Sequence, residues 1–137
     1  MLQNHPWEKV ILIDDDPLFL TINKRIIQQL LPEIPVQSFQ DSMQGLHFLL
    51  RNFPEKFHQK SRFLILLDLL MPKISGIKLI DTLYQYCEGF EQCYDIVVVS
   101  SSVQEIPLES LIIRGLIKNV AQKPLTLCFA KTVLEKI

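Results

Sequence analysis

Five apolar residues followed by a carboxylate, FLILLD at positions 63–68, form the most apolar strand that the sequence predicts. A continuous apolar run, in place of an alternating one, is typical of a strand buried on both faces of a parallel sheet. Two similar runs are VILI at 10–13, which leads into Asp14–Asp16, and IVVV at 96–99, which leads into Ser100. The sequence therefore predicts at least three buried parallel strands, each followed by a polar residue.

Helical patterns alternate with these strands. Asp16 and Pro17 supply a cap and a first-turn proline for the first helix. Its expected apolar face is Phe19, Ile22, Ile26 and Leu30. Further helices are expected at 43–53 behind Asp41 and Ser42, at 76–87 with Ile77, Ile80 and Tyr84 on one face, from Pro107, and from the cap Thr126 to Ile137. Short strands are expected at 36–39 and 117–121. Five βα units with right-handed crossovers predict an α/β fold with a doubly wound parallel sheet.

Length and composition indicate one domain over residues 1–137, with a short tail at 1–7 and no output domain. Fourteen Lys and Arg against fifteen Asp and Glu give a net charge of −1, so nucleic acid is not an expected partner. The longest apolar run is too short to span a membrane, and the first residues do not form a secretory signal, so a cytoplasmic location is expected. The three cysteines lack CxxC spacing and are expected to be free thiols.

Polar groups follow four of the predicted strands: Asp14–Asp16, Asp68, Ser100 and Lys123. Ligands of open parallel sheets bind beyond the carboxyl ends of the strands. Converging carboxylates favour a hard divalent cation, for which Mg²⁺ is the natural candidate. Lysine and serine add donors suited to phosphoryl oxygens, and a carboxylate can attack phosphorus as a nucleophile.

The segments Ile13-Asp14-Asp15, Asp68 to Pro72 with Gly76, Ser100 after its valine run, and Lys123-Pro124 together resemble the response-regulator receiver domain of two-component signalling. The resemblance covers nearly the whole chain. It implies a flavodoxin-like (βα)5 fold with five parallel strands in the order 2-1-3-4-5. It also implies phosphoryl transfer from a histidine kinase or phosphotransfer protein, followed by altered binding of an unidentified downstream protein.

The resemblance assigns a role to each matching position. Asp68 would be the phosphoacceptor, and Asp14 and Asp15 would bind Mg²⁺ together with Asp68 and the backbone carbonyl of Leu70. Ser100 and Lys123 would contact the phosphoryl group, with Ser100 moving as a switch. The Lys123–Pro124 peptide bond is expected to be cis.

Two positions depart from the family pattern. Val120 stands where much of the family has the aromatic residue of the switch, so repacking of aliphatic side chains would have to replace it. Leu70 is apolar and would not position a hydrolytic water, which predicts a long-lived phosphoryl form.

More apolar residues lie on the fourth and last helices than one buried face requires: Leu108, Leu111, Ile112, Ile113, Leu127, Val133 and Leu134. This surplus suggests that helix four, strand five and helix five form a docking face for a partner or a second copy.

Two alternatives stay open. A phosphatase resembling the haloacid dehalogenase superfamily could use Asp14 and Asp16, with Ser100 and Lys123 binding phosphate, but Leu18 does not fit its motif and Asp68 would have no role. A degenerate receiver could also act purely as a binding module without phosphorylation. Under the leading interpretation the protein is no enzyme beyond catalysing its own phosphorylation and dephosphorylation.

Overall fold

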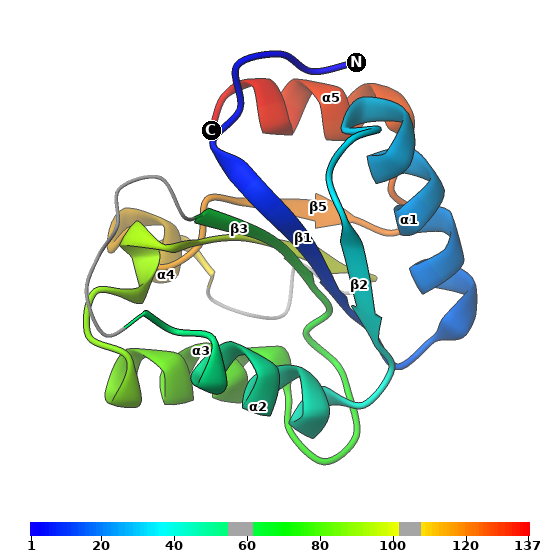
Figure 1. Ribbon diagram of the computed structural model, residues 1–137. Coiled ribbons are helices and arrows are strands. Elements are labelled where there is room, and N and C mark those ends of the chain that lie inside the picture. The colour runs from blue at the N-terminus through cyan, green and yellow to red at the C-terminus, as the bar shows by residue number, and fades with distance from the viewer. Residues whose placement is uncertain (55–61, 102–107) are drawn as a thin grey trace.

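One parallel sheet organises the chain, and a computed structural model describes it over residues 1–54, 62–101 and 108–137. The strand order is β2-β1-β3-β4-β5, which confirms the flavodoxin-like order (Figure 1). The strands are β1 (Trp7–Ile13), β2 (Val36–Phe39), β3 (Arg62–Leu67), β4 (Tyr94–Ser100) and β5 (Asn119–Gln122). Residues 64–67 of β3 and all of β4 are buried, as their continuous apolar runs predict.

Helices cover both faces of the sheet (Figure 1). The helices are α1 (Pro17–Leu30), α2 (Ser42–Arg51), α3 (Gly76–Tyr86), α4 (Glu109–Ile113) and α5 (Leu127–Glu135), with a short 3-10 turn, η1 (Phe90–Gln92). Two apolar clusters result. One lies against α2, α3 and α4, and the other packs the opposite face against α1 and α5. The last helix ends at Glu135 and not at Ile137, and the expected start of the fourth helix at Pro107 lies outside the described residues.

Helix α1 turns a different face to the sheet than the apolar pattern predicts. Its cap is as expected, because the Asp16 carboxylate accepts a hydrogen bond from the Leu18 amide at 2.9 Å. The buried residues, however, are Leu20, Asn23, Ile27 and Leu30. Asn23 interrupts this stripe with a polar side chain, so the neighbouring stripe with Phe19, which is only half-buried, is the more apolar of the two.

Helix α3 also departs from its expected face. Its inward residues are Gly76, Leu79, Ile80 and Leu83. Tyr84, which the pattern assigned to the buried face, is 57% exposed. The Arg114 guanidinium lies 4.8 Å from the centre of the Tyr84 ring, and this contact is compatible with a solvated surface position.

The expected tail at 1–7 is one residue too long, because Trp7 is already the first residue of β1. The remaining tail packs on the molecule. Leu2 is buried, and its amide donates to the Leu30 carbonyl at the end of α1 at 2.8 Å.

A buried carboxylate joins the starting ends of three strands. Asp95 of β4 is 1% exposed. It accepts a hydrogen bond from the Trp7 indole of β1 at 2.9 Å and forms an ion pair with the Arg62 guanidinium of β3. The Lys118 ammonium nitrogen lies 3.9 Å from an Asp95 carboxylate oxygen. This pairing compensates the loss of water around the buried charge.

The register between β1 and β3 sets up the other end of the sheet. Ile13 pairs with Leu67, and the Asp68 amide donates to the Ile13 carbonyl at 2.9 Å. The residues that follow these strands, Asp14 and Asp68, therefore emerge side by side.

Candidate functional site

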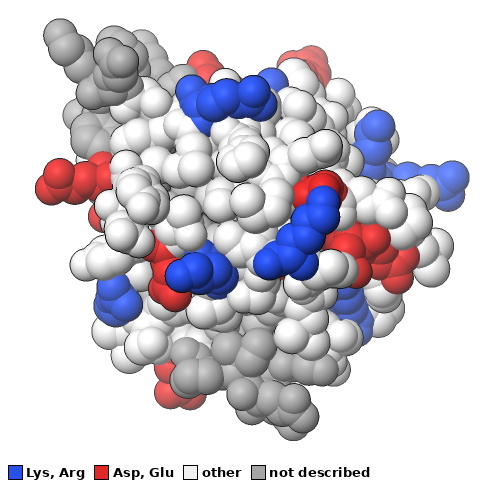
Figure 2. Space-filling view, turned by 90° about the horizontal axis from the view of Figure 1, so that it is seen from below, with Lys and Arg blue, Asp and Glu red and all other residues white. Residues whose placement is uncertain are grey.

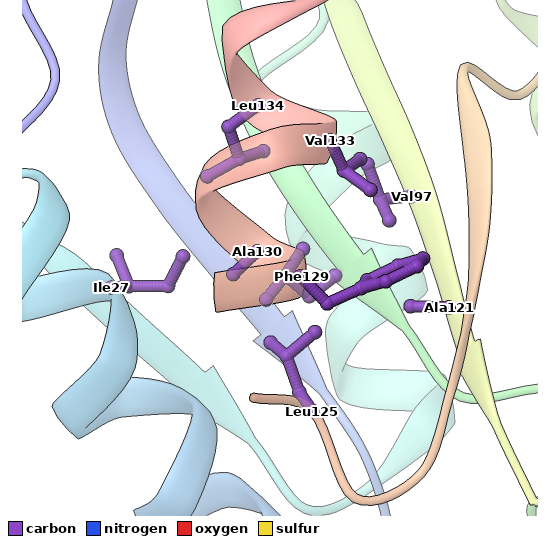
Figure 3. A pocket seen from close by; sticks show the side chains of 9 residues that line it. Ile27, Val97, Ala121, Leu125, Phe129, Ala130, Val133 and Leu134 are labelled. Carbon is purple, nitrogen blue, oxygen red and sulfur yellow. The ribbon is translucent and has the colours of Figure 1, made fainter. Parts of the chain in front are cut away.

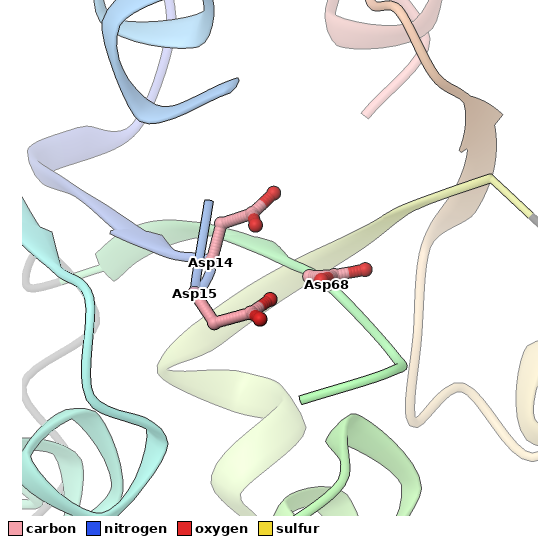
Figure 4. Close-up of side chains that lie close together, drawn as sticks. All are labelled: Asp14, Asp15 and Asp68. Carbon is pink, nitrogen blue, oxygen red and sulfur yellow. The ribbon is translucent and has the colours of Figure 1, made fainter. Parts of the chain in front are cut away.

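Three carboxylates meet where β1 and β3 end. Oxygens of Asp14, Asp15 and Asp68 lie within 4.8 Å of one another, and Figure 4 shows the three side chains pointing to the same side. Asp14 and Asp68 are buried, and Asp15 is half-buried. Three closely spaced oxygen donors form a group that a hard divalent cation can bridge, so these residues fit the Mg²⁺ expected from the sequence.

Lys123 brings a positive charge into this group from the loop after β5. Its ammonium nitrogen lies 2.7 Å from an Asp14 carboxylate oxygen and 3.4 Å from an Asp68 oxygen, and its side chain is 7% exposed. The Lys123 amide donates to the Ser100 carbonyl at 3.0 Å. The Lys123–Pro124 peptide bond is cis, as the resemblance implies. One lysine thus contacts carboxylates that follow two different strands.

The environment of Asp68 disfavours its charged form. The pKa of the Asp68 carboxyl is raised to about 6, chiefly by burial and next by the negative charge of Asp14, while Lys123 acts in the opposite direction. A bound cation would relieve both causes, since it replaces the lost water contacts and neutralises the repulsion.

The remaining expected site residues lie close to this group in the fold. Ser100 is fully buried at the end of β4. Val120 on β5 is half-buried and packs against the cluster on the α2 and α3 side. Leu70 follows Asp68 by two residues, and its side chain is 54% exposed. The metal contact of its carbonyl stays a prediction.

Gly76 is needed directly behind Asp68. A Cβ at this position would lie 2.4 Å from the Asp68 carbonyl oxygen and 2.9 Å from the Leu69 Cα. The Gly76 amide donates to the Leu69 carbonyl at 2.8 Å. The close approach of α3 to the end of β3 therefore depends on the missing side chain.

The loop after Asp68 is tied to α2 by contacts that the sequence analysis missed. The buried Ser42 hydroxyl donates to the Pro72 carbonyl at 2.8 Å, and Lys73 forms an ion pair with Asp41. These residues, with Gln40 and Asp15, line an open hollow of about 400 Å³ beside the carboxylates. No pattern along the chain could reveal these contacts, because they join the start of α2 to the loop after β3, about 30 residues later in the sequence.

The surface at the end of the sheet where β1 and β2 finish carries charge of both signs. Figure 2 views the molecule from below Figure 1, the side toward which β1 and β2 run. Acidic and basic side chains appear there in small groups on a mostly uncharged surface.

An apolar pocket between α5, α1 and the sheet offers little room for a ligand. Its lining is entirely apolar, and Figure 3 shows the Phe129 ring extending from α5 toward Ala121. The accessible space of about 10 Å³ is at the lower limit for one water molecule. Across the described ranges, no helix has the length and apolar character to cross a membrane.

Asp16 takes no part in the carboxylate group. Its side chain caps α1, as described above. The dehalogenase-like interpretation needs that carboxylate in the site, and the geometry disfavours it for this reason.

Solved structures with the same fold include several response regulators and receiver domains. A two-component response regulator from Cytophaga hutchinsonii matches with a TM-score of 0.74 and 23% identity, over 93% of this chain and 94% of that one. A CheY-like receiver domain protein from Methanospirillum hungatei matches with a TM-score of 0.64 and 20% identity, over 96% and 91%. The receiver domain of an HD domain-containing protein from Pseudomonas fluorescens matches with a TM-score of 0.69 and 16% identity, over 97% and 94%.

The sequence itself identifies the family. No curated protein matches the chain. The model of the response regulator receiver domain, in contrast, matches residues 10–127. Since this match runs from β1 to the first residue of α5 and includes the acidic group and its lysine, the chain belongs to the family of response regulator receiver domains.

Proposed function

We propose that this protein accepts a phosphoryl group onto Asp68 from the phosphohistidine of a histidine kinase or a phosphotransfer protein. The observation that carries the proposal is the placement of Lys123, whose ammonium contacts both Asp14 and Asp68 in a nearly dry site. A buried carboxylate with a raised pKa beside a second carboxylate and a lysine is the arrangement expected of a functional group and not of a surface residue.

In the transfer, an Asp68 carboxylate oxygen forms a bond to phosphorus while the bond between phosphorus and the histidine nitrogen breaks. The electron pair of the broken bond stays on the imidazole, which then takes a proton from water. The product on this chain is an aspartyl phosphate. Mg²⁺, held by Asp14, Asp15, Asp68 and the Leu70 carbonyl, would supply positive charge for the phosphoryl oxygens.

Lys123 and Ser100 complete the environment of the transferred group. The Lys123 ammonium can exchange its contact with Asp14 for one with a phosphoryl oxygen, and the Ser100 hydroxyl can donate to another oxygen. Phosphorylation then alters the surface that a downstream partner binds. The docking face formed by α4, β5 and α5, whether for a partner or a second copy, is part of this proposal. Ile113 of α4 is 85% exposed and Leu127 of α5 is 43% exposed.

Intact mass after incubation with phosphoramidate and Mg²⁺ tests the proposal. Phosphoramidate carries a phosphorus–nitrogen bond like that of phosphohistidine. We expect the parent protein to gain one phosphoryl group and Asp68→Asn to gain none. Asp81→Asn, which removes an exposed carboxylate of α3, is the matched control and should behave like the parent.

Failure of the parent to gain mass would contradict phosphoryl transfer. That failure would favour a second candidate function, a binding module that acts without phosphorylation. The observation behind this candidate is Val120, which stands where much of the family has the aromatic residue of the switch.

A further inference from the structure

An aromatic ring lies over the lysine of the site. The Lys123 ammonium nitrogen is 4.2 Å from the centre of the Phe19 ring on α1. This contact is shorter than that of Lys9 with Phe48, at 5.4 Å. The Lys123 side chain is almost fully buried, so the ring faces a cation that has lost most of its water. Cation–π attraction is strongest under these conditions.

The position of Phe19 is set by the start of α1. Asp16 caps the helix through the Leu18 amide, and the Leu20 amide donates to the Asp16 carbonyl at 3.1 Å. Leu20 then enters the core, which leaves Phe19 half-buried at the edge of the helix that faces the site. The apolar pattern predicts Phe19 as a core residue, but in the structure its ring lies beside the Lys123 ammonium.

The three groups around the Lys123 ammonium differ in what phosphoryl transfer does to them. Asp14 and Asp68 are carboxylates that Mg²⁺ would bind, and Asp68 becomes esterified under the proposed function. The Phe19 ring is neutral, so Mg²⁺ would not compete with the Lys123 ammonium for it. It is the one of these three contacts that can persist unchanged while the others are replaced.

We propose that Phe19 is a positioning residue for phosphoryl transfer, whose ring holds the Lys123 ammonium in place while its anionic partner changes from Asp14 to a phosphoryl oxygen. This inference rests on the proposed function of Asp68 and adds to it a role for α1. The ring is not itself a reacting group, and its role is exerted through Lys123.

Site-specific replacement of Phe19 by phenylalanines with one, two and three ring fluorines tests the inference. Each fluorine weakens the negative face of the ring while changing its size little. We expect the logarithm of the phosphorylation rate with phosphoramidate to fall steadily with fluorine number, to about five-fold below the parent for the trifluoro ring. Phe19→Tyr should retain the rate, and Phe19→Leu should lower it like the trifluoro ring.

Phe129 provides the matched control. It is 44% exposed on α5, and in the described part of the chain no cation lies over its ring. The same fluorinated series at position 129 should leave the rate unchanged. A flat series at position 19, with the parent phosphorylated normally, would overturn the inference.

A second measurement does not depend on phosphorylation. The Phe19 ring current should shift the Lys123 side-chain methylene signals in NMR spectra, and Phe19→Leu should remove this shift. If the parent shows the shift but is not phosphorylated, the proposed function fails while the contact stands. An absent shift in the parent would overturn the inference directly.

Discussion

Asp68 carries its charge at a place where folding makes that charge costly. Its carboxyl group is removed from water and lies beside Asp14, and its pKa rises from 3.8 to about 6. Because the protonated form is favoured in the folded state, this group contributes stability that is fully present below pH 3.8 and is lost as the pH rises through 6. At neutral pH without a cation, the ionised carboxylate therefore weakens the fold.

Asp68→Asn should stabilise the metal-free protein at pH 7.5. The amide keeps the size of the carboxyl group and removes its charge. Solvent and Lys123 screen part of the cost, so we expect a gain of about 1 kcal/mol in the free energy of unfolding, measured with urea. The gain should disappear below pH 4. Asp81→Asn should show no such trend, and a gain for Asp68→Asn that is independent of pH would contradict the explanation.

The site residues differ in how far the sequence alone could identify them. Asp14 and Asp68 follow the buried strands β1 and β3, and Lys123 follows the edge strand β5. Parallel strands place the residues that follow them at one edge of the sheet. Phe19 and Ser42 belong to helices that approach the site from the side. Their roles depend on the rotation of a helix about its axis, which no strand-end rule specifies.

Helix α1 illustrates why the face of an element is harder to predict than its existence. Both candidate stripes of α1 contain apolar residues at helical spacing, and the buried one contains Asn23. Among the residues that the structure describes, the Asn23 side-chain oxygen is buried and has no hydrogen-bond partner. A buried polar group without a partner lowers the stability of the fold. It also interrupts the apolar periodicity of the helix, so the buried face of α1 cannot be recognised from that periodicity.

Asn23→Leu should therefore stabilise the protein. The substitution removes the unpaired side-chain oxygen and adds apolar surface on the face that carries Leu20 and Ile27, for an expected gain of about 1 kcal/mol in the free energy of unfolding. Gln28→Leu makes a comparable change at an exposed position of α1 and should have little effect. Urea unfolding of the three proteins distinguishes the cases, and destabilisation by Asn23→Leu would show that the amide is satisfied in solution.

The strands were predicted more accurately than the helix faces. The bounds of β2 agree fully, and those of β3 differ only by the addition of Arg62. Strand β5 covers Asn119–Gln122 in place of the expected 117–121. β1 and β4 begin earlier than expected, at Trp7 and Tyr94, because both residues are buried by long-range contacts: Trp7 with Asp95 and Tyr94 with the Leu49 carbonyl. Partners so distant in the sequence leave no local pattern.

At the scale of the whole molecule, two apolar layers enclose the sheet, and the tail extends one of them. Leu2 joins the layer against α1 and α5. The tail lies at the starting end of β1, whereas the acidic group follows the opposite end of that strand (Figure 1). Stability and phosphorylation should therefore respond separately to changes in the tail.

Deletion of residues 2–5 should lower the free energy of unfolding by about 1–2 kcal/mol, because the burial of Leu2 and its hydrogen bond to Leu30 are lost. The phosphorylation rate of the folded protein should not change. Leu2→Ala in the full chain should reproduce about half of the loss. A slower phosphorylation rate in the deletion variant would indicate coupling between the two ends of the sheet.

Trp7 is the only tryptophan of the chain, and its indole is fixed to Asp95 at the starting end of β1. The seven residues of that strand separate it from Asp14 by about 20 Å. We therefore expect Trp7 fluorescence to report whether the protein is folded and to respond little to what occupies the acidic site. A phosphodonor or cation that stabilises the fold can be detected, without any label, as a shift in the midpoint of the fluorescence transition.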